Sequence, residues 1–454
     1  MSNARKTVCK RVTDVLRGGD SVALSRKVIE RCIGQDYGKE RYSSGISSCY
    51  NEKKARIALA LAISLWIGGA GVAWADEHET VYADKTVNTD ESEKNYSLAG
   101  NIDAARGEGI TFTVESGGKV KTIQGNDIYV KSSGNTVTVK SGGEVNASST
   151  FSDAIIGGTS NNEVTVEDGA TVTGTVYGGA NIGGISTGNH VVVKGTVNNA
   201  VIGGYGATAT NNTVEVIGGH VGVVWGGYGN SNDNTTNNTV ILKNATVDGN
   251  VYGGYREGDV TGNTLIVSGI NTVGGNVERL KTIKLTSDLA WDSTNAVLTA
   301  AKYYKGSLES SIAIDISEAS ALKDRTERGT MTLLKATDWL ANFTLSGSAI
   351  TTEGVTVQST TKSSEANGVI IGYNNTHTVA LANSNKDITY SIDNYANKIT
   401  LGTILWNKNG TARALTAGEF TFNDSTTIDK ADFEFNTPTN VVAGDSMTLL
   451  SNAT

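Results

Sequence analysis

Asn135-Thr-Val-Thr-Val139 is the first copy of a motif that recurs along the middle of the chain. Six copies follow one another at intervals of 23 to 27 residues. The others are Asn162-Glu-Val-Thr-Val166, Asn189-His-Val-Val-Val193, Asn212-Thr-Val-Glu-Val216, Asn238-Thr-Val-Ile-Leu242 and Asn263-Thr-Leu-Ile-Val267. A fixed period in this range is typical of repeat proteins, in which each unit buries its apolar face against its neighbours.

A second motif, an apolar pair followed by Gly-Gly, alternates with the first and keeps its spacing. Its five copies are Ile155-Ile-Gly-Gly158, Val176-Tyr-Gly-Gly179, Val201-Ile-Gly-Gly-Tyr205, Val224-Trp-Gly-Gly-Tyr228 and Val251-Tyr-Gly-Gly-Tyr255. Alternation in the Asn-x-Val-x-Val motif sends both valines to one face of a strand. Gly-Gly and Asn disfavour helix, and we expect them to supply the positive-φ residues at the corners of a coil.

These patterns predict an all-β protein, a β-solenoid in which each repeat forms one coil. If the coils keep register, the first residue of each motif stacks into a ladder of side-chain amides. That ladder comprises Asn135, Asn162, Asn189, Asn212, Asn238 and Asn263. Tyr177, Trp225 and Tyr252 are expected to stack in the same way, with Ile156 and Ile202 in the corresponding positions.

The regular repeats are predicted to span 135–280, after an N-terminal cap over 76–134 where the chain begins the solenoid. Beyond them a longer echo appears, because Thr282-Ile-Lys-Leu285 and Met331-Thr-Leu-Leu334 recur as Lys398-Ile-Thr-Leu401 and Met447-Thr-Leu-Leu450. Ile283 and Ile399 are 116 residues apart, as are Met331 and Met447. We therefore expect residues 281–454 to form two related, irregular β-rich units, the second of them truncated.

Residues 1–75 are predicted to be an extended leader that ends in a signal peptide. Lys53, Lys54 and Arg56 precede an apolar run over 57–72, and the small-residue site Ala73-Trp-Ala75 follows before Asp76. This order is typical of a signal peptide cleaved after Ala75. A membrane-spanning helix is the alternative, but the run contains three glycines and falls short of the ~20 residues that a span needs. A misassigned start codon is the alternative explanation for the length of the leader.

Charge and cysteine content bound the class of function. The chain holds 38 Lys+Arg and 46 Asp+Glu, of which 13 and 6 lie in residues 1–75, so 25 and 40 remain and the later part carries about −15. An acidic surface repels nucleic acid, so no nucleic-acid partner is expected. All three cysteines, Cys9, Cys32 and Cys49, precede the predicted cleavage site, which excludes disulfides and thiolate metal sites from the mature part.

The basic leader, the cysteine-free mature region and the two repeat motifs together resemble the passenger part of Gram-negative autotransporters, from Lys53 to Thr454. Similar repeats occur in filamentous haemagglutinin-like exoproteins. The resemblance implies a right-handed parallel β-helix on the cell surface or outer membrane, or secreted from it, that binds a host-surface or sister-cell ligand. It also implies a C-terminal β-barrel in the outer membrane, which this chain does not contain; release through a separate partner is the alternative.

Residues able to carry out catalysis are scattered. We expect structural or solvent-facing roles for the four histidines, His78, His190, His220 and His377, because no carboxylate or serine lies at a partnering position in the sequence. Gly444-Asp-Ser446 resembles the nucleophile segment of serine-protease autotransporters and Gly-Asp-Ser-Leu esterases, but Arg328-Gly-Thr330 occupies the equivalent place in the other unit, which favours a turn. No metal, cofactor or enzymatic activity is predicted.

Two rival functions remain open. A polysaccharide-active β-helix enzyme would need clustered acids and bases on one face, and Arg256, Glu257 and Asp259 form the densest group in the repeats, interpreted as a solvated loop. A self-associating surface scaffold is the second rival, because the edges of an uncapped solenoid favour pairing.

Overall fold

The computed structural model describes residues 77–98, 109–124, 126–127, 130–148, 152–229, 234–255, 261–304, 311–366, 369–401, 413–420, 432–435 and 448–453. All of them belong to one compact unit, Asp76–Thr454. The leader over 1–75, with Ala73 and Ala75, and the cleavage residue Asp76 lie outside the described residues. So do Arg256, Glu257, Asp259 and the Gly444-Asp-Ser446 segment.

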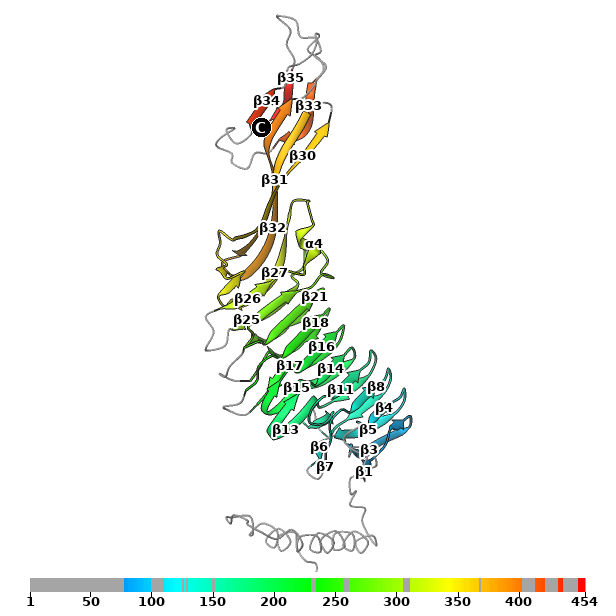
Figure 1. The fold of residues 1–454 in the computed structure, drawn as a ribbon. Coiled ribbons are helices and arrows are strands. Elements are labelled where there is room, and N and C mark those ends of the chain that lie inside the picture. The colour runs from blue at the N-terminus through cyan, green and yellow to red at the C-terminus, as the bar shows by residue number, and fades with distance from the viewer. Residues whose placement is uncertain are drawn as a thin grey trace, which may run out of the picture. The chain divides into compact units, whose positions relative to one another are not determined.

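The described part is a β-solenoid, as the repeats predict, built from stacked parallel coils. Figure 1 shows the strands of successive coils, from β4 and β8 to β18 and β21, one after another along the stack. Its right-handed sense stays a prediction. Among the described residues, no helix is long and apolar enough to cross a membrane.

Two large sheets form the walls of the solenoid. The first, here called sheet 1, contains the Asn-x-Val-x-Val strands: β2 (Lys85–Val87), β4 (Thr111–Val114), β8 (Thr136–Val139), β11 (Glu163–Val166), β14 (His190–Val193), β16 (Thr213–Ile217), β18 (Thr239–Lys243), β21 (Thr264–Ser268), β24 (Thr282–Leu285), β26 (Ile312–Asp315), β28 (Phe343–Leu345) and β29 (Ser348–Ala349).

Sheet 2 contains the Gly-Gly strands and has 19 members. They are β1 (Glu77–Val81), β3 (Asp90–Leu98), β5 (Lys119–Gln124), β9 (Glu144–Asn146), β10 (Asp153–Ile156), β12 (Thr171–Thr173), β13 (Thr175–Thr187), β15 (Thr196–Thr210), β17 (His220–Tyr228), β19 (Thr246–Val247), β20 (Val251–Tyr252), β22 (Asn271–Val273), β23 (Val277–Glu278), β25 (Leu298–Tyr304), β27 (Gly329–Trp339), β30 (Val355–Ala366), β31 (Val369–Ala382), β32 (Asp387–Leu401) and β34 (Asp432–Phe435). Two small pairs lie outside these sheets: β6 (Asn126–Asp127) with β7 (Val130–Lys131), and β33 (Arg413–Phe420) with β35 (Thr448–Ala453).

The core consists of columns of aliphatic side chains in register. Val164 pairs with Val137 on one side and Val191 on the other, and the three side chains are fully buried. The same register continues through Val214, Val240, Leu265 and Ile283. A one-residue slip would turn each column to solvent, so burial of alternate valines fixes the register of every coil.

The corner of each coil is formed by a residue with positive φ directly before the ladder asparagine. These corner residues are Gly134, Asn161, Gly188, Asn211, Asn237 and Gly262, with φ between 55° and 72°. Gly and Asn adopt this conformation more readily than other residues, which explains why one or the other occupies the position in each of these coils.

The expectation that the Gly-Gly pairs supply the positive φ is wrong, since no member of those pairs has one. The pairs are required by close approach instead. A Cβ added to Gly203 would lie 2.4 Å from the Gly226 carbonyl oxygen and 3.0 Å from the Cβ of Asn212.

The parallel stack ends in an antiparallel pairing. β27 pairs in parallel with β25 on one edge and antiparallel with β32 on the other, where Met331 lies opposite Tyr390. β28 is likewise covered by the antiparallel β29. Ile283 and Ile399, which occupy equivalent places in the longer sequence echo, lie in different settings. Ile283 lies in β24, which pairs in parallel, whereas Ile399 lies in β32, which pairs antiparallel with β31 and in parallel with β34.

Candidate interaction surface

The six ladder asparagines lie in one buried column, each at most 2% exposed. The Oδ1 atom of each accepts a hydrogen bond from the backbone N–H of the asparagine one coil earlier, at 2.9 to 3.2 Å, and Asn135 accepts the N–H of Ile110. From Asn162 to Asn238, Nδ2 also donates to Oδ1 of the next asparagine. These amides are used within the protein, so the ladder stabilises the corner and does not face a ligand.

Aromatic side chains gather on the outer surface of sheet 2, beside the Gly-Gly pairs. We call this set the aromatic face; it comprises Tyr177, Ile202, Tyr205, Trp225, Tyr228, Tyr252 and Tyr255. Its six rings are half-buried, and Ile202 is buried between the coils. Successive side chains of a strand point to opposite faces. In the first row the preceding residue is a valine buried in the core, and in the second row it is the second glycine of the Gly-Gly pair, so the side chains of the aromatic face project outward.

The first row of the face follows the register of the apolar pair. Tyr177 pairs with Ile202, Ile202 with Trp225, and Trp225 with Tyr252. The Trp225 and Tyr252 rings stack with centroids 3.7 Å apart and an interplanar angle of 14°. The predicted stacking is thus confirmed for this pair, whereas Ile202 separates Tyr177 from it.

A second row, Tyr205, Tyr228 and Tyr255, was not predicted as an aromatic cluster. The Tyr228 ring lies 5.2 Å from the Tyr205 ring and 4.2 Å from the Tyr255 ring, inclined by 68° and 41°. It meets the Trp225 ring edge-on at 5.0 Å, which joins the two rows. The available sequence signal was the Tyr that follows Gly-Gly in three successive copies of the second motif.

Charged groups stand at the two ends of the aromatic face. At one end, burial and the nearby Asp153 carboxylate raise the pKa of the Tyr177 phenol well above its ordinary value. At the other end the Arg279 guanidinium lies 5.3 Å from the centre of the Tyr252 ring and 3.8 Å from the Glu278 carboxylate. Beyond the face, β13 carries Ile182 and Ile185, which are 69% and 57% exposed.

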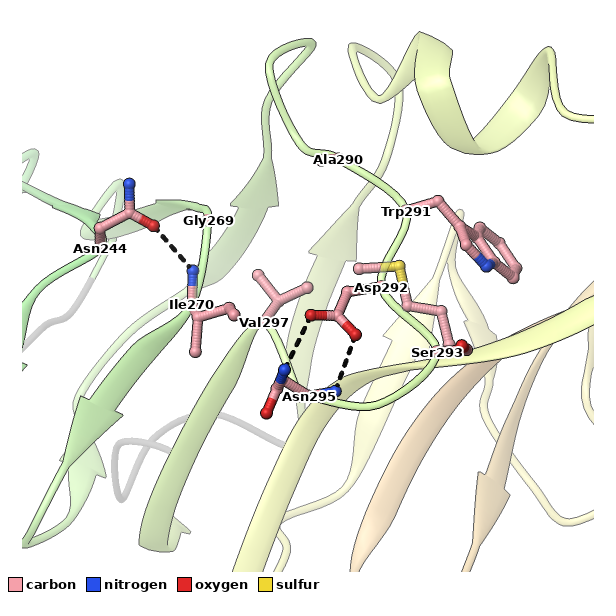
Figure 2. A pocket seen from close by; sticks show the side chains of 10 residues that line it. Asn244, Gly269, Ile270, Ala290, Trp291, Asp292, Ser293, Asn295 and Val297 are labelled. Atoms are coloured by element: carbon pink, nitrogen blue, oxygen red, sulfur yellow. Dashed lines mark hydrogen bonds between the residues drawn. The ribbon is translucent and has the colours of Figure 1, made fainter.

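A pocket of about 400 Å³ lies farther along the solenoid, beside Ile270, Trp291 and Met331. Figure 2 shows that its polar side chains turn to neighbouring backbone: Asn244 Oδ1 accepts the Ile270 N–H at 3.1 Å, and Asp292 accepts the Asn295 N–H at 3.0 Å. Because these acceptors are already engaged within the protein, the pocket is a weaker candidate site than the aromatic face.

Three of the four histidines have side-chain partners on the neighbouring coil, which sequence spacing did not reveal. Nε2 of His190 lies 3.0 Å from the Glu215 carboxylate, and Nε2 of His220 lies 2.8 Å from Asp248. His78 contacts Ser97 at 2.9 Å. Buried His377 contacts the Tyr390 hydroxyl, at 2.7 Å, across the β31–β32 pair.

Within the described ranges, no three His, Cys, Asp or Glu side chains come together as a potential metal site. No family model, curated protein or solved structure matches the chain.

Proposed function

We propose that the chain is a binding protein of the bacterial cell surface, the β-solenoid passenger of an autotransporter-like protein. In this proposal the signal peptide directs export, a β-barrel outside this chain anchors the passenger in the outer membrane, and the solenoid contacts a host surface or a sister cell. The aromatic face carries the proposal. Tyr and Trp are enriched in binding surfaces because they bury much area at little entropic cost.

Export is tested in the cell that makes the protein. The recovered polypeptide is expected to begin at Asp76, and proteinase K added to intact cells is expected to degrade it. Ala75→Leu should block cleavage, because the site requires a small residue there. Ala70→Leu, within the apolar run, is the matched control and should be processed normally. A polypeptide that retains residues 1–75, or that resists the protease until the cells are lysed, would contradict the proposal.

A further inference from the structure

The aromatic face is not a requirement of the solenoid. In the first row its positions are filled in other coils by Ile156, Ile202 and Glu278, all in register with the aromatic residues. In the second row, Ala180 pairs with Tyr205. Small, aliphatic and charged side chains therefore fit the same places, so the concentration of rings over consecutive coils calls for a reason other than folding.

The strand segments that form this face carry no charge. Residues 176–187, 201–210, 224–229 and 251–255 contain no Asp, Glu, Lys, Arg or His, although the part of the chain after Ala75 has a net charge near −15. Their polar side-chain groups are the hydroxyls of Tyr, Thr and Ser, the amide of Asn181 and the indole N–H of Trp225. A face whose charged groups stand only at its two ends, within an acidic protein, is matched to an uncharged partner, since a cationic ligand would be drawn to the acidic surroundings instead.

The geometry of the rings narrows the chemistry of that partner. In the first row, Tyr252 is stacked between Trp225 and Arg279, so it presents its edge. The rings of the second row are inclined to one another and are partly exposed. The C–H faces of sugars pack on aromatic rings, and a tyrosine hydroxyl can both donate to and accept from sugar hydroxyls. The rings also repeat from coil to coil at the spacing of parallel strands, about 4.8 Å, which suits a polymer of small repeating units.

We propose that the aromatic face binds a neutral carbohydrate chain that runs across successive coils. The inference rests on the proposed binding function but not on export, so the test uses the protein purified from the expressing cell and reads binding alone. An intracellular location would overturn the export proposal and leave this one standing.

The experiment is affinity electrophoresis in native gels containing dextran, galactomannan, xyloglucan or mixed-linkage β-glucan, with polygalacturonate as the acidic comparison. Retardation by at least one neutral polysaccharide is expected, at both low and high salt. Tyr228→Ala and Tyr205→Ala should each weaken binding by about tenfold or more, the scale of losing one stacked ring. Tyr228→Phe, which keeps the ring, should bind within a few-fold of the unaltered protein.

The matched control is Tyr82→Ala, because Tyr82 is 46% exposed and lies outside the aromatic face. It should leave retardation unchanged, and circular dichroism should report native β-structure in every variant compared. The proposal is overturned if no neutral polysaccharide retards the protein, if only polygalacturonate does, or if the Tyr228 and Tyr205 variants bind normally. Ring-dependent self-association without retardation, measured by sedimentation, would assign the face to a second copy of the chain and also overturn it.

Discussion

Removing one asparagine from the middle of the ladder should loosen the coil before it. Asn212 Oδ1 accepts the backbone N–H of Asn189 at 3.1 Å and its Nδ2 group at 2.8 Å, while Asn212 Nδ2 donates to Asn238 at 3.1 Å. Asn212→Ala removes these three bonds and a fourth, from Asn212 Nδ2 to the Ser186 carbonyl oxygen at 3.2 Å, and leaves the buried Asn189 N–H without an acceptor.

The cost follows from these contacts. A buried donor left unsatisfied costs about 1–3 kcal/mol, and each lost hydrogen bond contributes roughly 0.5–1.5 kcal/mol. Because Asn189 Nδ2 keeps its bond to Ser186 at 3.1 Å, the orphaned backbone group dominates. We expect the free energy of unfolding to fall by about 3 kcal/mol.

Urea denaturation measures this change, and Asn198→Ala is the control because Asn198 lies in β15 with an exposed side chain. The control should stay within about 0.5 kcal/mol of the unaltered protein, as surface substitutions do. Hydrogen exchange should locate the effect at the Asn189 amide, because repeats couple mainly to their neighbours. If Asn212→Ala proves no more destabilising than the control, the ladder does not hold the corner.

Three further predictions concern packing and titration. Gly203→Ala should destabilise the solenoid by about 2 kcal/mol or more, because the added Cβ meets the Gly226 carbonyl. Gly218→Ala, at φ 68° with open space around it, is the control and should cost only about 1 kcal/mol. Equal unfolding midpoints of the two variants in urea would refute the close-approach argument. Trp225→Ala should abolish the near-ultraviolet circular dichroism of the stacked pair and lower the free energy of unfolding by about 1–3 kcal/mol. Trp225→Phe should keep most of the stability. An unchanged spectrum for Trp225→Ala would show that the rings do not stack. Burial raises the pKa of the Tyr303 phenol well above its ordinary 10.0, so the folded state holds that proton more tightly than the unfolded state does. The contribution to stability should therefore be full below pH 10 and fall as the pH rises above it. Tyr303→Phe should reduce this alkaline loss and Tyr82→Phe should not, so identical pH profiles for the two variants would contradict the assignment.

The coil and its register were predictable because they depend on local alternation repeated many times. Val164 and Val191 occupy the same phase of the same motif, so a stack that buries one buries the other. The position of Asn162 and Asn189 at a shared corner follows from that register. What the alternation did not specify was the direction of the amide bonds, in which each Oδ1 accepts from the preceding coil.

The partners of the histidines could not be predicted, because coil length varies between the repeats. His190 and Glu215 are 25 residues apart, and His220 and Asp248 are 28 apart. A pairing between coils depends on how many residues each corner inserts, which the strand motif does not record. The antiparallel closure by β32 was hidden for a related reason, since alternating burial is compatible with either strand direction.

The ladder and the aromatic face are linked through the glycine pairs. Gly226 and Gly227 lack side chains because a Cβ at either would come within 2.6 Å of the next coil or of the Asn238 amide. The next coil's backbone and the ladder together impose two bare positions, and the outward residues on both sides, Trp225 and Tyr228, meet across them at 5.0 Å. Requirements of the buried corner therefore shape the surface, and they leave the identity of the flanking residues free to serve binding.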